Sequence, residues 1–508
     1  MSFLVNNAAA IAVGAVVAAL GWMFGGTRGS LLTPVVPWLS VLMVEVLVCF
    51  PQRRHGENTY GARDRVWREL KKDPMTWLVV GFLALLALPF VNNGLCVNCD
   101  AAKIAQGISP DPPVRFLPFC VNRIDHLNVF LWFAAALPAM LIVRRALEPR
   151  GKRLVLELAV WNGVALAALG FVQHALDAPG PLWSEASGLV SGKVGDFFST
   201  FGYPNMAGDY FTLLFGISVA LWRRRAGEVR EERRMQDISG AAAARPRNFW
   251  TAHYFLIPSA IFFYAALNTL SRAAIMLVTA SAVVYFLHAF VAYLARLRRA
   301  QRVKATAVGL LAAGAIVFVA TLFAPEDLRR EVDTIGTTEV LDRVTGRGQY
   351  HTRVATAIWG EHKLFGVGGW GYVHFCIPMM TPEERADVQM VGGINVHNDY
   401  LQFLAEHGVA GFGALAAMVV LLVLPIGRAW RRMAHDTRFL KPKDLPPRPV
   451  QVFVLPAPVF CLLVALGCTL VHAFGDCPLR SPAVLTLFFA ALAAMPGFMP
   501  EKGCRCCT

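Results

Sequence analysis

A histidine, an asparagine and two glycines have spacings that could place a reactive group at the mouth of a membrane helix. They lie in NVHNDYLQFLAEHGVAGFG, residues 395–413, which leads into a long apolar run. If a helix begins at or just before His397, Gly408 and Gly411 follow on one face, at about 100° per residue. Glycines on such a face let a neighbouring helix approach closely in lipid. The pattern therefore predicts a fixed His397, with Asn398 beside it, that could accept a proton from a hydroxyl group.

Three arginines stand where they could bind an anion near that histidine. Arg272 lies in a short polar turn between two apolar runs, and Arg347 and Arg353 lie in the long polar stretch before His397. An ionisable side chain at membrane level is costly and is a functional candidate by default. The alternatives are an interfacial Arg272 that snorkels to lipid headgroups, and a solvated charged loop for the other two.

Asn205 and Trp359 are supporting candidates. Asn205 follows Pro204 at the start of an apolar run, where it could cap a helix or line a cavity. Trp359 comes after Arg353 and before the glycine-rich segment LFGVGGWG, residues 364–371. No Asp-x-Asp or His-Glu-x-x-His pattern accompanies them on the same side of the membrane, so we expect no metal and no cofactor.

Membrane helices must position these residues, because 56% of the chain is hydrophobic and only 16% is charged. Apolar runs long enough to cross a bilayer, about 17–25 residues each, recur along the chain. The expected fold is an all-α polytopic membrane protein with about twelve spans, and no cleavable signal peptide is predicted. The spans are expected near 5–25, 34–51, 75–92, 126–143, 154–175, 207–222, 249–267, 273–294, 305–323, 400–426, 450–473 and 481–498.

The distribution of cations predicts the orientation of these spans. The stretches that follow every second span, together with the tail, hold 34 of the 48 Lys and Arg residues. Cationic loops stay on the cytoplasmic side, so both termini are expected there and residues 324–399 form one large loop outside. The net charge of +14 thus reflects topology and contact with anionic lipid, not nucleic-acid binding.

The spacing His-Asn-x9-Gly-x-x-Gly resembles the O-antigen ligase family. Three other elements share the resemblance: the Ser-Arg-Ala at Arg272, the arginine, tryptophan and Gly-x-Gly order that begins at Arg353, and the Gly-x-Pro-Asn element at Asn205. Together they cover residues 195–430. Residues 1–194 and 431–508 match only in hydropathy, as N-terminal helices and as C-terminal helices with a cytoplasmic tail.

The resemblance implies a glycosyltransferase of the bacterial inner membrane with its active site facing the periplasm. The implied donor is a glycan on undecaprenyl pyrophosphate, and the acceptor is lipid A–core oligosaccharide, another glycan or a protein. Arg272, Arg353 and Arg347 would bind the pyrophosphate through bidentate contacts. His397 would be the general base, kept neutral by a helix N-terminus and nearby arginines.

The shared motifs do not distinguish an O-antigen ligase, the favoured reading, from a polysaccharide polymerase or a protein O-oligosaccharyltransferase. A transporter or flippase is the alternative from another class, because twelve spans are also common among secondary carriers. The polar candidates gather at one membrane face, which favours the enzyme.

Cysteines of the outward segments suggest a covalent or metal link. Cys96-Val-Asn-Cys99 lies in one such segment with Cys120, and Cys376 and Cys477 also face outward. In an oxidising compartment a disulfide is the favoured interpretation and half of a zinc site the alternative. The tail from Cys504 to Cys507 could be palmitoylated, but its role is otherwise unexplained.

Overall fold

The computed structural model describes residues 2–27, 29–92, 112–114, 116–183, 197–239, 249–295, 297, 301–311, 326, 328–330, 338–385, 395–439 and 455–499. Throughout these residues the regular structure is helical, and the one β-contact is an isolated bridge between Phe198 and Phe201. The predicted all-α class is therefore confirmed. The main helices are α1 (Ser2–Asn6), α2 (Ala8–Trp22), α3 (Gly29–Cys49), α4 (Thr59–Lys72), α5 (Pro74–Ala87), α7 (Arg123–Leu141), α8 (Pro149–Ala175), α9 (Pro204–Ser239), α10 (Phe249–His253), α11 (Leu256–Asn268), α12 (Arg272–Leu294), α15 (Thr338–Glu361), α16 (Gly371–Met379), α18 (Asp399–Phe439), α19 (Ala457–Gly475) and α20 (Pro482–Ala494).

Seven helices of the described chain are long and apolar enough to cross a membrane, and an eighth span results if α4 and α5, bent by 69°, are one. The shorter apolar helices Ala8–Trp22 and Pro482–Phe498 also coincide with predicted runs. A multi-pass membrane protein is thus supported, whereas the count of twelve is not confirmed. Most of the expected run 305–323 lies outside the described residues.

Helix starts follow ordinary capping chemistry. Asn122 accepts hydrogen bonds from the first amides of α7, Asp73 caps α5 ahead of Pro74, and Ser271 caps α12. These short polar side chains satisfy amides that lack an intrahelical partner. Helix ends are therefore set by local sequence, as the hydropathy pattern requires.

The centre of the bundle is α20, every residue of which is buried. It packs against α7 and α8, while α9 packs against α11 and α19. Glycines permit the closest approaches: a Cβ at Gly14 would lie 2.6 Å from the Leu158 side chain, and one at Gly216 would lie 2.4 Å from Ala465. Small residues at helix contacts are the expected solution in lipid, where tight van der Waals packing replaces the hydrophobic effect.

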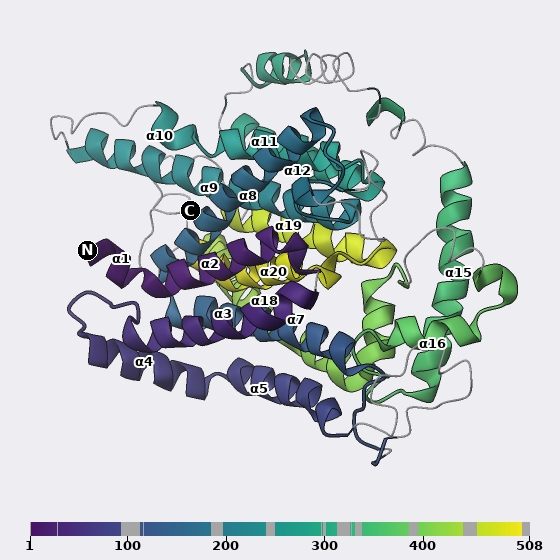
Figure 1. Ribbon diagram of the computed structural model, residues 1–508. Helices are drawn as coiled ribbons and strands as arrows, with labels where there is room; N and C mark the ends of the chain where they lie inside the picture. Colours follow the sequence, from purple (N-terminus) through teal and green to yellow (C-terminus); the bar gives the residue numbers. More distant parts are fainter. Residues whose placement is uncertain are drawn as a thin grey trace.

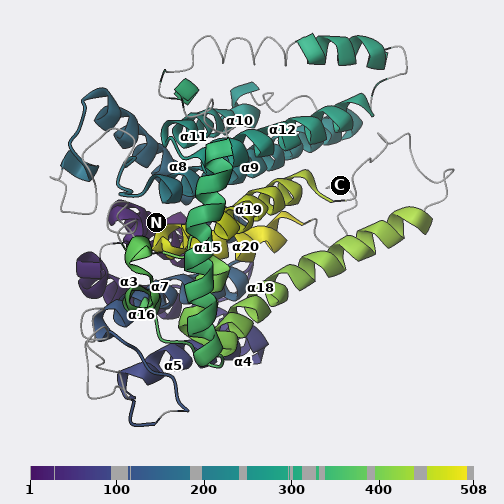
Figure 2. The same ribbon diagram turned by 90° about the vertical axis from the view of Figure 1, so that its right-hand side faces the viewer.

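A cap lies across one end of this bundle. Helix α15 runs across the ends of the bundle helices with α16 beside it, and α1 and α4 lie at the opposite end (Figures 1 and 2). A second apolar core, separate from that of the bundle, joins the cap to the first turns of α18 through Val354, Ile358, Tyr372 and Ala405. The large loop predicted at 324–399 therefore carries helices and a core of its own.

Candidate active site

His397 lies at the junction of cap and bundle, two residues before α18 begins. The expected helix start at His397 is wrong: α18 starts at Asp399, and Asn398 is its cap, with Oδ1 accepting the Leu401 amide at 3.0 Å. His397 itself has a left-handed backbone, with φ of 53°. A non-glycine residue in this region is uncommon and costs free energy. The cap chemistry of Asn398 thus turns the chain and directs the His397 side chain out of the helix.

The imidazole of His397 is paired with Asp476. Its Nδ1 lies 3.3 Å from Asp476 Oδ1, while the His397 side chain is 43% exposed and the Asp476 side chain 5%. Asp476 follows the last residue of α19, so its place was not evident from the motif around His397. The histidine is open to a substrate and the carboxylate behind it is not. This is the arrangement expected of a base and the group that orients it.

Besides His397, the residues Tyr203, Cys477 and Asn205 hold the Asp476 carboxylate. The Tyr203 hydroxyl lies 3.1 and 3.0 Å from its two oxygens, the Cys477 amide donates to Oδ1 at 2.8 Å, and the Asn205 side chain donates to Oδ2. Burial alone would raise the pKa of Asp476, but the hydrogen bond and charge of His397, with the charge of His472, lower it to about 2. Burial and the Asp476 charge raise the pKa of Tyr203 well above its ordinary value. Asp476 is therefore an ionised carboxylate, and the Tyr203 hydroxyl that contacts it is neutral.

Asp476 adds an electrostatic influence on His397 that the sequence motifs did not include. A carboxylate next to an imidazole stabilises the imidazolium form, whereas the sequence suggested surroundings that favour the neutral ring. Because ionised Asp476 can only accept, Nδ1 of His397 must donate to it. The neutral tautomer that results carries its lone pair on Nε2, which is the atom able to accept a proton.

His397, Asp476 and Cys477 form a group whose potential ligand atoms lie within 4.8 Å of one another. Burial, followed by the Asp476 charge, raises the pKa of Cys477 well above its ordinary value. Its sulfur lies 3.3 Å from Asp476 Oδ1, as a thiol donating to a carboxylate would. These surroundings favour a hydrogen-bonded thiol over a free thiolate, although a metal ion would itself deprotonate a thiol that coordinates it. Cys376 and Cys477 are both buried free thiols, so neither forms the expected disulfide; Cys96, Cys99 and the tail lie outside the described residues.

His351 is a neighbour of His397 that lies outside the sequence motifs. It comes from α15, is buried, and its ring centre lies 6.1 Å from that of His397. The Tyr372 hydroxyl lies 2.7 Å from His351 Nδ1 and joins α15 to α16. The cap therefore contributes a side chain to the surroundings of His397.

Gly408 does not lie in a continuous helical stripe. Its backbone, with φ of 61° and ψ of −170°, breaks α18. A Cβ at Gly408 would lie 2.3 Å from the Leu364 backbone, and one at Gly366 would lie 2.3 Å from the Glu406 backbone. The predicted helix–helix contact at Gly408 is thus wrong: the glycine admits a loop of the cap. Gly411, three residues on, would meet the His407 side chain of its own helix at 2.6 Å.

Backbone hydrogen bonds fill the break in α18. The amides of Val409 and Ala410 donate to the carbonyls of Lys363 and Leu364 at 2.9 and 3.0 Å, and the Gly368 amide donates to Glu406 at 2.8 Å. Backbone groups freed within a membrane protein must find such partners. The glycine-rich segment 364–371 and the Gly408 motif therefore form one structural unit. It holds the cap against the bundle.

Arg272 lies at the start of α12, in a turn that packs on the first turns of α9. A Cβ at Gly208 of α9 would lie 3.3 Å from Ser271 and 2.4 Å from Ala274. Asn205, which contacts Asp476, stands one turn earlier on α9. The structure therefore brings the Arg272 turn beside the start of α9, which contacts Asp476, the partner of the candidate base His397.

Arg353 and Arg347 are both on α15, but at different faces. Arg353 is exposed and forms an ion pair with Glu384, at 2.7 Å between Nη2 and Oε2. By helical spacing, position 347 shares a face of α15 with His351, which is one turn away, whereas position 353 does not. The Arg347 side chain is not among those that the structure describes. Trp359 packs on the cap core, and its buried Nε1 has no hydrogen-bond partner among described residues.

Buried charges continue from the site into the bundle. Asp209 of α9 lies 3.1 Å from His472 Nδ1 and accepts from the Thr469 hydroxyl at 2.8 Å. Arg480 contacts Glu406 at 2.8 Å and Asp399 at 3.6 Å. These pairs fix the ends of α9, α18 and α19 relative to one another. His407 is buried beside Phe403 and His126.

Asp476, Tyr203 and His351 are the residues of this site that the motifs did not supply. Only their outward position in the predicted topology could have indicated them.

Residues 257–416 of the chain match the family model described as O-antigen ligase. The match includes His397, Arg272, Arg347 and Arg353, and it confirms the resemblance drawn from the motifs. A comparison with curated proteins finds no match.

Proposed function

This chain carries an O-antigen ligase domain, and we propose that it is a membrane glycosyltransferase that moves a glycan from undecaprenyl pyrophosphate to an acceptor hydroxyl on the periplasmic side of the inner membrane. The observation that supports this most is the pairing of half-exposed His397 with buried Asp476 at the capped end of a membrane bundle. It supplies a base where a lipid-linked substrate could reach it.

The proposed reaction is a single displacement. Nε2 of His397 takes the proton of the acceptor hydroxyl, whose oxygen attacks the anomeric carbon. The bond between that carbon and the phosphate oxygen breaks, and the lipid pyrophosphate leaves with the electron pair. Attack opposite the leaving group inverts the anomeric carbon. Asp476 holds the ring and stabilises the imidazolium that forms.

Fixed cations must meet the charge that develops on the pyrophosphate. We assign this role to Arg272, Arg353 and Arg347, because an arginine fork binds phosphate oxygens in bidentate geometry. Asn398 and Asn205 position the base, the first by capping α18 and the second by holding Asp476. Gly408 and Trp359 support the cap.

The test is glycan transfer from a purified lipid-linked donor, normalised to folded protein, with and without EDTA. Transfer that requires His397 and survives the chelator is the expected result. Full transfer by His397→Ala would refute the mechanism, and loss with EDTA would assign a metal to the cluster at Asp476.

We propose the ligase reaction, onto lipid A–core, over the polymerase and protein-glycosylation reactions. A gene deletion distinguishes the three. Loss of long polymer from the lipopolysaccharide core supports the ligase. Shortened free polymer identifies a polymerase, and an unglycosylated protein identifies an oligosaccharyltransferase.

A further inference from the structure

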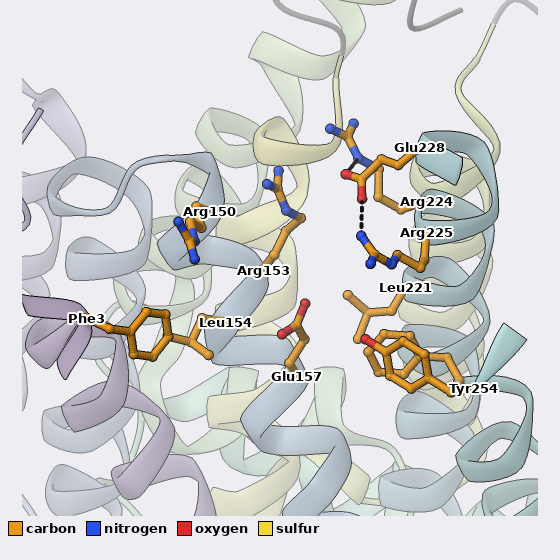
Figure 3. Close-up of a pocket in the computed structure, with 11 residues that line it drawn as sticks. Phe3, Arg150, Arg153, Leu154, Glu157, Leu221, Arg224, Arg225, Glu228 and Tyr254 are labelled. Atoms are coloured by element: carbon orange, nitrogen blue, oxygen red, sulfur yellow. Dashed lines mark hydrogen bonds and ion pairs between the residues drawn. The ribbon is translucent and has the colours of Figure 1, made fainter. Parts of the chain in front are cut away.

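A cavity of about 240 Å³ lies far from His397, between α1, α8, α9 and the residues that join α10 to α11. Six of its lining residues are charged: Arg150, Arg153, Glu157, Arg224, Arg225 and Glu228. Four arginines against two glutamates leave two positive charges in excess. Figure 3 shows the arginines of α8 and α9 on either side of one space.

The glutamates do not neutralise all four arginines. Glu228 pairs with Arg224 and Arg225, at 2.8 and 3.4 Å. Arg153 has a single hydrogen bond within the described chain, to the Gly497 carbonyl at 3.5 Å, and Arg150 lies over the Phe3 ring at 5.5 Å. Neither of these two has a carboxylate partner among described residues. Glu157, the other carboxylate of the cavity, is also on α8 and forms no ion pair among the described residues, so the α8 side carries two arginines and one glutamate.

The backbone adds to this positive potential. Arg150 and Arg153 belong to the first turns of α8, which begins at Pro149. The first amides of a helix carry a partial positive charge and favour anions. An anion between α8 and α9 would thus meet two arginines and a helix N-terminus.

Apart from Glu157, the rest of the cavity is lined mainly by apolar and aromatic side chains. Leu154, Leu221 and Phe255 line it, and in Figure 3 the Leu154, Leu221 and Tyr254 side chains lie below the arginines. A soluble anion would gain nothing from these side chains, whereas a phospholipid has a phosphate joined to acyl chains. A cavity with a net positive rim and a largely apolar floor suits an amphipathic anion.

The position of the cavity agrees with such a ligand. Arg224 follows Asn205 by 19 residues on the same helix, α9. At about 1.5 Å per residue, this places the cavity about 30 Å from the His397 site, the thickness of a bilayer core. Basic pockets between membrane helices bind anionic headgroups on the cytoplasmic side.

We infer that this cavity binds the phosphate of an anionic membrane phospholipid, with the start of its acyl chains on Leu154, Leu221 and Phe255. The site is separate from the transfer chemistry, and it would anchor α8 and α9 at the face opposite the active site. Its test does not depend on glycan transfer.

Protein purified in detergent is titrated with dioleoyl phosphatidylglycerol or dioleoyl phosphatidylcholine, and bound lipid is counted by native mass spectrometry. We expect selective retention of phosphatidylglycerol. In Arg153→Gln/Arg224→Gln this binding should weaken about thirtyfold, since each arginine near an anionic headgroup contributes about 1 kcal/mol and 1.4 kcal/mol is tenfold. The matched control is Arg63→Gln/Arg68→Gln on α4, which removes the same charge from exposed positions and should bind as the parent does.

Three outcomes would overturn the inference. The first is unchanged lipid binding by the Arg153/Arg224 variant, and the second is an equal loss of lipid binding in the α4 control. The third is displacement of the lipid by an excess of inorganic phosphate, which would assign the cavity to a soluble anion. If the double variant does not fold, the exposed Arg150→Gln serves instead. It should weaken binding about fivefold, and an unchanged affinity there would equally refute the site.

Discussion

The imidazole of His397 and the carboxylate of Asp476 meet across the capped end of the bundle, 79 residues apart in the chain, with Nδ1 3.3 Å from Oδ1. One residue precedes α18 and the other follows α19, so the pair exists only because these helix ends are packed together. Tyr203 and Asn205 at the start of α9 complete the surroundings of the carboxylate. Three elements thus converge on one hydrogen-bonded pair.

His397→Ala should lower the rate of glycan transfer by about 10²–10⁴-fold, the usual contribution of a general base. Asp476→Asn should lower kcat with little change in donor KM, because the amide can donate to Nδ1 and favour the wrong tautomer. Steady-state kinetics with purified donor measure both effects. His174→Ala, an exposed histidine on α8, is the control and should be fully active. An Asp476→Asn enzyme with unchanged kcat would remove the orienting role.

The lowered pKa of Asp476, about 2, predicts an acid-dependent loss of stability. A carboxyl whose pKa is lower in the folded protein than its ordinary value of about 3.9 stabilises the fold at higher pH. That contribution is lost as the pH falls from about 4 toward 2. The apparent unfolding temperature in detergent, followed by tryptophan fluorescence, should fall over this window in the parent and less in Asp476→Asn. Identical curves for both proteins would contradict the assignment.

Gly408→Ala should detach the cap from the bundle. Its φ and ψ are essentially restricted to glycine, and a Cβ would collide with the Leu364 backbone. The expected loss is about 1–3 kcal/mol of stability for the backbone strain alone, seen as a lower unfolding temperature and faster proteolysis of residues 338–385. Gly366→Ala should behave in the same way. Gly427→Ala, with no atom within 4 Å of its Cβ site on the same helix, is the control and should be neutral or stabilising. Equal behaviour of Gly408→Ala and Gly427→Ala would show that the break is dispensable.

The three arginines should raise the donor KM when replaced by alanine. Arg353 must exchange its Glu384 partner for pyrophosphate, so Glu384→Gln should leave donor binding intact or improve it. Arg272→Lys should not restore full activity, because an ammonium lacks the bidentate fork. Arg330→Ala, a largely exposed arginine, is the control. Donor KM values, measured variant by variant, identify which of Arg347 and Arg353 binds the donor, and a normal KM in both would exclude α15 from donor binding.

The proposed orientation places residues 324–399 outside the cytoplasm. Reporter fusions near Gly346 should therefore read periplasmic, and fusions after Arg150 or Arg234 should read cytoplasmic. The reason is the accumulation of Lys and Arg in alternate loops. A cytoplasmic signal at Gly346 would put His397 on the wrong side for a donor in the outer leaflet.

Local sequence was sufficient for the helices and for the residues that cap them. Apolar runs long enough to cross a bilayer must form helices to satisfy their backbone groups. Asn398 and Ser271 set the starts of two of these helices by accepting hydrogen bonds from nearby amides. The spacing around His397 was also enough to indicate the resemblance to O-antigen ligases, because the family model matches the same segment. These features depend on residues close together in the chain.

Contacts between distant elements were decided by the tertiary structure. The sequence around a glycine in an apolar helix does not indicate whether the helix continues or breaks. At Gly408 the helix breaks because the backbone at Leu364 packs against it and hydrogen-bonds to the residues that follow. Asp476 and His351 have no motif, since a buried pairing depends on which helix ends pack together and not on spacing along one helix. The sequence by itself thus determined the helices and the candidate base, His397. The packing of the helices determined which carboxylate, that of Asp476, orients it.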